Sequence, residues 1–182
     1  RVANNNFANC LGNRGHIAFG LTAIAAANFR NVVIHGNTFD SNTAVSLYTD
    51  TTIGSVPNGI VISNNIASNV EYFLNKVTGS VYGLTLANNI ISGTASGYGR
   101  VNVGDGTASY TVKDLTVAHN DITSSVGVPV AVSDGVENAT FDGNVMRGAT
   151  QAHISIGSIG TTSTNVKIVN NTFLGTPTAA VQ

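Results

Sequence analysis

The chain repeats one short pattern seven times, and each copy is centred on an asparagine. The second copy reads NVVIHGNTF from Asn31 to Phe39, and the seventh reads NVKIVNNTF from Asn165 to Phe173. Apolar residues lie five and three positions before the central asparagine and two positions after it, which is the alternation of a β-strand rather than the period of a helix. The central asparagines, spaced 24 to 32 residues apart, are Asn5, Asn37, Asn65, Asn89, Asn120, Asn144 and Asn171.

A second alternating apolar run follows each asparagine, as at 101–103 and 130–132. Two or three short strands in each interval are typical of one coil of a parallel β-helix, in which coils stack at the strand spacing of ~4.8 Å. Like residues then stack on like residues. The pattern therefore predicts an all-β solenoid of about seven coils, with apolar columns in a continuous core and the asparagines in a hydrogen-bonded ladder that points inward.

Composition excludes several other classes of protein. Charged residues make up 9% of the 182 residues and the net charge is −1, so the basic footprint of a nucleic-acid-binding protein is missing. No apolar run approaches the ~20 residues of a membrane span. The chain has a single cysteine, Cys10, which excludes an internal disulfide and a cysteine metal cluster. We expect no cofactor, no nucleic-acid partner and no membrane partner.

The repeat pattern resembles the right-handed parallel β-helix of the pectate-lyase-like superfamily, and within it the phage tailspikes and related polysaccharide depolymerases. The resemblance covers residues 1–182 as a single domain. It implies a polysaccharide partner, a parallel homotrimer, and a location that is extracellular or on the virion surface. Because the chain opens inside a strand and shows no capping segment at either end, we expect it to be a fragment of a longer solenoid.

Two aspartates are the best candidates for an acid pair. Asp105 and Asp134 each lie two residues after the last inward residue of a second strand, so they should stack in neighbouring coils. Two carboxylates ~5 Å apart repel, which separates their pKa values as the acid and the nucleophile of a glycosidase require. The alternative interpretation is that both are Asp-Gly turn residues, and that the charge of Lys76 in the preceding coil neutralises the charge of Asp105.

Further side chains around this sheet are candidates for substrate binding. Lys76 and Arg100 can hold acidic sugars, and Arg100 also stacks next to Glu71 in the adjacent coil. Tyr98 offers an aromatic face to a sugar ring. The alternative for Glu71 and Arg100 is an exposed ion pair of little energetic value.

Two other kinds of site are less favoured by the pattern. His119, Asp121 and Asp142 lie in adjacent coils and could provide a general base, but His119 occupies a column that is otherwise filled by turn residues. Lyases of this fold typically bind Ca²⁺ with several carboxylates, and here no coil holds three acids together, so no metal site is expected.

Three functional classes remain open. The first is a carbohydrate-directed segment that binds a polysaccharide and, if it is an enzyme, cleaves it as a glycosidase or a lyase. The second is a structural stalk or adhesin solenoid without catalysis. The third is an ice-binding solenoid, which is disfavoured because the outward column of Thr85, Thr116 and Thr140 changes to Val33, Val61 and Lys167 in other coils.

Overall fold

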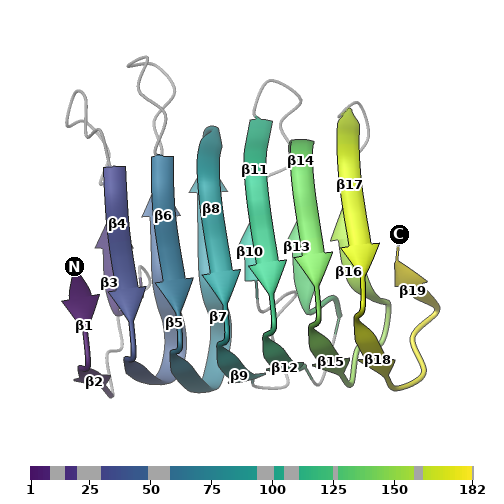
Figure 1. Cartoon of the computed structure of the whole chain (residues 1–182). Coiled ribbons are helices and arrows are strands. Elements are labelled where there is room, and N and C mark those ends of the chain that lie inside the picture. The colour runs from purple at the N-terminus through teal and green to yellow at the C-terminus, as the bar shows by residue number, and fades with distance from the viewer. Residues whose placement is uncertain are drawn as a thin grey trace.

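The computed structural model describes residues 1–8, 15–19, 30–48, 58–93, 101–104, 111–124, 127–157 and 162–181, with residues 19, 42, 48 and 76–78 described by their backbone alone. Every regular element in these ranges is a β-strand, as Figure 1 shows. The strands are β1 (Val2–Ala3), β2 (Asn6–Phe7), β3 (Ile17–Phe19), β4 (Arg30–His35), β5 (Thr38–Tyr48), β6 (Asn58–Ser63), β7 (Ile66–Thr78), β8 (Val81–Ala87), β9 (Ile90–Gly93), β10 (Val101–Val103), β11 (Thr111–Ala118), β12 (Asp121–Thr123), β13 (Val130–Val132), β14 (Gly135–Asp142), β15 (Val145–Arg147), β16 (Ala152–Ile156), β17 (Ser163–Val169), β18 (Thr172–Leu174) and β19 (Ala179–Val181).

These strands form two parallel sheets that run the length of a solenoid. The seven-stranded sheet has the order β1-β4-β6-β8-β11-β14-β17, so it takes one strand from each copy of the repeat. The twelve-stranded sheet contains the remaining strands in two rows, and the long strands β5 and β7 belong to both rows. The two rows share these strands because register shifts within them, as between Asn42 and Thr43, let the chain turn the corner without a break.

The predicted parallel β-solenoid is therefore confirmed. The expected number of about seven coils is not confirmed, because the structure shows about four turns. About four turns are described without interruption from first strand to last, namely 30–48, 58–78, 135–156 and 163–181. In the other three repeats, one or more segments lie outside the described ranges.

A left-handed backbone conformation precedes every ladder asparagine. The φ angle of this residue lies between 54° and 65° in all seven copies. Glycine and asparagine tolerate this conformation best, which explains why they fill most of the column. His119 adopts it as well, with φ of 54°, so its place in the turn column is confirmed. The members are Asn4, Gly36, Asn64, Asn88, His119, Gly143 and Asn170.

The predicted asparagine ladder is present along the whole solenoid. In each of its six steps, the backbone N–H and the side-chain Nδ2 of one asparagine both donate to Oδ1 of the next, at 2.8–3.1 Å. From the second asparagine onward, Nδ2 also donates to a backbone carbonyl of the preceding coil, as in Asn89 to Ile62. The five inner asparagines, which are Asn37, Asn65, Asn89, Asn120 and Asn144, are at most 2% exposed.

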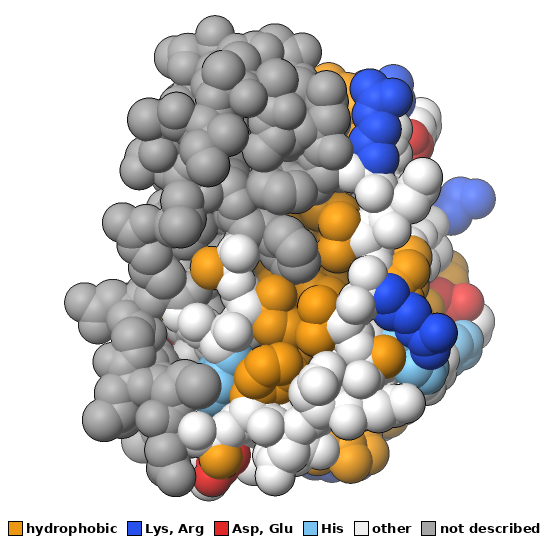
Figure 2. Space-filling view, turned by 90° about the vertical axis from the view of Figure 1, so that its left-hand side faces the viewer, with side chains coloured by type: hydrophobic (Ala, Val, Ile, Leu, Met, Phe, Trp, Pro, Cys, Tyr) orange, Lys and Arg blue, Asp and Glu red, His pale blue; other side chains and the backbone are white. Residues whose placement is uncertain are grey.

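Apolar columns fill the space between the sheets. Phe39 is fully buried, stacks on Phe7 with ring centroids 5.2 Å apart, and meets Phe73 edge-on at 6.5 Å. Ile91, Ile122 and Met146 continue this column and are at most 2% exposed, whereas Phe173 in the last coil is half-buried. Figure 2 looks onto the N-terminal end of the solenoid, where hydrophobic side chains gather in the middle of the cross-section and polar ones surround them.

Candidate functional site

The structure describes only part of the acid pair that the sequence predicts. Val103 and Val132 pair in register, so the strands that precede the two aspartates are placed as expected. Asp105 lies outside the described residues. Asp134 is fully buried, and its carboxylate packs so closely on Gly104 that a side chain at Gly104 would collide with it. The catalytic role of the pair stays a prediction, and the burial of Asp134 favours the alternative turn interpretation.

The predicted substrate-binding residues are mostly beyond what the structure describes. Arg100 and Tyr98 lie outside the described ranges, and so does the side chain of Lys76, whose backbone pairs with Val103. Glu71 lies in β7 with a half-buried side chain. Of the six predicted site residues, only Glu71 and Asp134 have described side chains, so the substrate-binding groove stays a prediction.

In the predicted general-base cluster of His119, Asp121 and Asp142, the two acids have different partners. Asp121 forms an ion pair with Arg147. Asp142 accepts a hydrogen bond from Asn170 at 3.0 Å. The imidazole of His119 lies across Gly143 of the next coil and is exposed. Because each acid has its own partner on a neighbouring strand, these three residues do not form the arrangement of a general base with its orienting carboxylate.

A polar surface that the sequence analysis did not single out covers the outer face of the seven-stranded sheet. Tyr82, Lys113 and Glu137 lie side by side on β8, β11 and β14. Nζ of Lys113 forms an ion pair with Oε1 of Glu137 at 3.0 Å. The hydrogen bond and the negative charge of Glu137 raise the pKa of Lys113 above its usual value, so Lys113 is fully charged at neutral pH.

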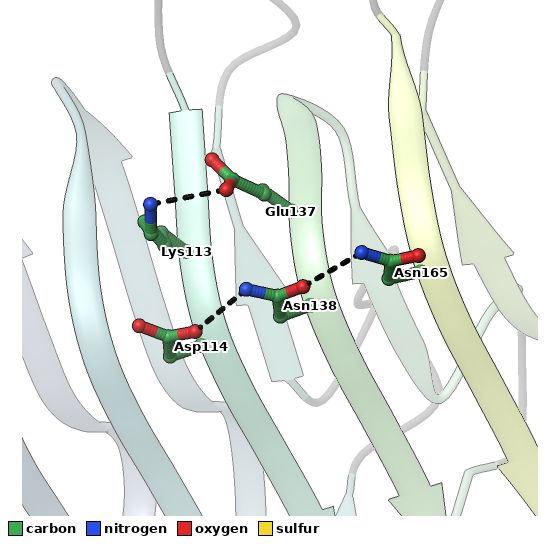
Figure 3. A network of polar contacts seen from close by, with 5 residues as sticks. All are labelled: Lys113, Asp114, Glu137, Asn138 and Asn165. Carbon is green, nitrogen blue, oxygen red and sulfur yellow. Dashed lines mark hydrogen bonds and ion pairs between the residues drawn. The ribbon is translucent and has the colours of Figure 1, made fainter.

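A second amide ladder runs along this outer face. Nδ2 of Asn138 donates to Oδ1 of Asp114, and Nδ2 of Asn165 donates to Oδ1 of Asn138, both at 3.0 Å. Figure 3 shows these three residues, with Lys113 and Glu137, projecting from the same side of β11, β14 and β17. All three have φ between 53° and 59°, so each strand has a left-handed residue within it, and all three of these residues are exposed.

Threonines complete the outer face. Thr85, Thr116 and Thr140 pair in register on three successive strands, and Lys167 continues their row on β17. Beside this row, Asn138, Thr140, Asn165, Val166 and Lys167 line a shallow hollow of about 480 Å³. The outer face therefore presents one aromatic ring, together with amides, hydroxyls and charges on successive strands.

The signal for this surface was present in the aligned repeats. The face can be found by aligning the outward positions of consecutive copies. One column then contains Tyr82, Lys113 and Glu137, and the next contains Asp114, Asn138 and Asn165.

The described residues contain no group of three histidine, cysteine or acidic side chains arranged to hold a metal ion. No helix of sufficient length and apolar character to cross a membrane occurs in these ranges.

Comparison with known proteins places the chain in no established family. No protein-family model matches it. No curated protein and no solved structure gives a significant match. The parallel β-solenoid is thus shown by the coordinates of this chain alone, and the pectate-lyase-like and tailspike resemblance rests on the repeat pattern.

Proposed function

We propose that this chain is a carbohydrate-binding solenoid segment of a tailspike-like or extracellular protein, and that it binds glycan on the outer face of the seven-stranded sheet. The observation that carries the proposal is a set of adjoining outward polar groups on successive strands, with Tyr82 beside Lys113 and Glu137 in one row and Thr85, Thr116 and Thr140 in another. Sugars present hydroxyls that both donate and accept, and asparagine amides and threonine hydroxyls do the same. An aromatic ring can stack on the apolar face of a pyranose, as Tyr82 can here.

The support beneath these groups is rigid. The strands that bear them are joined by continuous parallel pairing, and their inward side chains, such as Val117 and Phe141, are fully buried. A surface that is already ordered loses little conformational entropy on binding, which makes weak individual contacts add up to measurable affinity.

The spacing of the face favours one orientation of the ligand. Neighbouring strands lie ~4.8 Å apart, which is close to the length of one sugar unit in an extended β-linked chain. A linear glycan that runs along the solenoid axis therefore meets one strand with each sugar. In this orientation it passes either from Tyr82 over Lys113 to Glu137, or from Thr85 over Thr116 and Thr140 to Lys167.

A glycan array tests the proposal, followed by titration of the best-binding glycan. We expect Tyr82→Ala to weaken binding at least tenfold. Tyr72→Ala is the matched control, because Tyr72 is also half-buried but lies on the twelve-stranded sheet, and it should leave binding unchanged. Equal losses in the two variants would contradict the assignment of the face.

The principal alternative is a structural stalk. The uninterrupted asparagine ladder and the continuous core favour it, because both give length and stiffness without a ligand. Failure of the wild-type chain to bind any glycan on the array would favour this alternative. Separate hypotheses are polysaccharide cleavage by Asp105 and Asp134, assembly as a homotrimer and a place on a virion surface.

A further inference from the structure

The two lysines of the outer face differ in their electrostatic surroundings. Lys113 is paired with Glu137, so its charge is largely balanced within the protein. Lys167 is exposed on β17, and no acidic side chain among the described residues forms an ion pair with it. The unpaired charge of Lys167 therefore lies beside the hollow that it lines, whereas Arg30, which is also exposed on this sheet, lies toward the other end of it on β4.

The groups around Lys167 form a mixed set of donors and acceptors. Thr140 lies opposite Lys167 on β14 and provides a hydroxyl. Asn165 uses its Nδ2 to donate to Asn138, which leaves its Oδ1 directed away from Asn138 and exposed (Figure 3). The hollow thus offers one ammonium, one hydroxyl and one amide oxygen, with Val166 as its apolar component.

We propose that this hollow binds an anionic substituent of the glycan, a carboxylate or a sulfate. The ammonium of Lys167 pairs with the anion, the hydroxyl of Thr140 donates to it, and Oδ1 of Asn165 accepts a hydroxyl of the same sugar. This inference rests on the proposed function, because it assigns one sugar of the bound chain to the strand pair β14 and β17. The volume of the hollow agrees with this assignment, since about 480 Å³ accommodates a monosaccharide with its substituent.

The test uses three soluble polymers with the same extended β-linked backbone: hydroxyethyl-cellulose, carboxymethyl-cellulose and cellulose sulfate. We expect the wild-type chain to bind one or both anionic polymers about fivefold more tightly than the neutral one, which is the size of effect that an exposed charge pair can give. Lys167→Gln should remove this difference, and Lys167→Arg should retain it. Arg147→Gln is the matched control and should retain it as well, because Arg147 is paired with Asp121 on the twelve-stranded sheet, away from the outer face.

The outcomes separate this inference from the proposed function. The polymer that shows the preference identifies the anion as carboxylate or sulfate, and the preference should shrink as salt is added. If Lys167→Gln keeps the full preference, or if the wild type binds the neutral polymer as tightly as the anionic ones, the inference is overturned while glycan binding by the outer face stands. If the wild type binds none of the polymers, the inference is also overturned, and the glycan array alone then decides the proposed function.

Discussion

Asn89 donates two hydrogen bonds to a single atom of Asn120, one from its backbone N–H at 3.0 Å and one from Nδ2 at 2.9 Å, both to Oδ1. Both residues are at most 2% exposed, so water does not compete for these bonds. The same oxygen therefore satisfies one main-chain and one side-chain donor at the turn between the two sheets. The ladder fixes the stacking register of the coils because a shift of one residue would leave both donors unpaired inside the protein.

Removal of a buried ladder amide should cost much more than removal of an exposed one. Asn120→Ala leaves the backbone N–H and Nδ2 of Asn89 without their acceptor, and we expect the free energy of unfolding to fall by roughly 2–4 kcal/mol. Asn138→Gly removes an exposed rung of the outer ladder and keeps the left-handed turn, so its cost should stay below about 1 kcal/mol. Urea denaturation measures the free energy of unfolding of both variants. Similar losses in the two variants would show that burial does not determine how much a ladder amide stabilises the protein.

The aromatic column near the N-terminal end should be a second point of high sensitivity. Phe39 is fully buried and contacts the rings of Phe7 and Phe73, so Phe39→Ala should destabilise the protein by roughly 3–5 kcal/mol. Phe173→Ala removes the same side chain from a half-buried position in the same column and should cost clearly less. A loss below about 1 kcal/mol for Phe39→Ala would contradict the packing described here.

The fold was predictable from the sequence to an unusual extent, because a solenoid repeats its structural constraints in every coil. A single asparagine at position 65 says little, but seven at matching positions define a column, and the structure bonds them as expected. The left-handed turn residues were identifiable for the same reason. His119 follows the same reasoning, since its place in the aligned turn column predicted a left-handed φ that its residue type alone would not indicate.

The candidate site was less predictable, because the chemistry of a surface depends on which polar groups already have partners. The sequence directed attention to charged residues such as Asp134, which turned out to be buried. It gave no reason to separate Lys113 from Lys167, although the structure pairs only the first of them with a described acid. Sequence alone also cannot distinguish an outward amide that bonds along the sheet, such as Asn138, from one that faces solvent unpaired.

Substitution of Asp134 distinguishes catalysis from a role in the turn. If Asp134 is an acid catalyst, its substitution should abolish glycan cleavage and leave the stability of the protein unchanged. If Asp134 is a turn residue, its substitution should lower the stability and leave any cleavage unchanged. Because the carboxylate is fully buried against Gly104, we expect Asp134→Asn to lower the free energy of unfolding by roughly 1–3 kcal/mol without abolishing cleavage selectively. Thermal unfolding and a reducing-end release assay, run on the same preparation, provide the two readouts, and selective loss of cleavage would restore the acid-pair hypothesis.

Self-association should depend on a small apolar patch of the twelve-stranded sheet. Ile66 and Ile90 are 48% and 56% exposed and pair in register on β7 and β9. Among the described residues, the other large apolar side chains with comparable exposure lie in the last coil. If the chain forms the expected parallel homotrimer through this patch, Ile90→Glu should convert the trimer to monomers in light scattering. Thr116→Glu, on the other sheet, should leave the trimer intact, and a wild-type monomer at high concentration would contradict the expectation.

The claim that the outer face of the seven-stranded sheet binds glycan is tested most directly by NMR, through the amide chemical shifts of the wild-type chain during titration with its best-binding array glycan. The account predicts that the perturbed amides cluster on β8, β11, β14 and β17, around Tyr82, Thr116, Asn138 and Lys167. It predicts no comparable change on the second sheet around β13 and Asp134. Perturbations centred on β10 and β13, with the outer face unchanged, would contradict it.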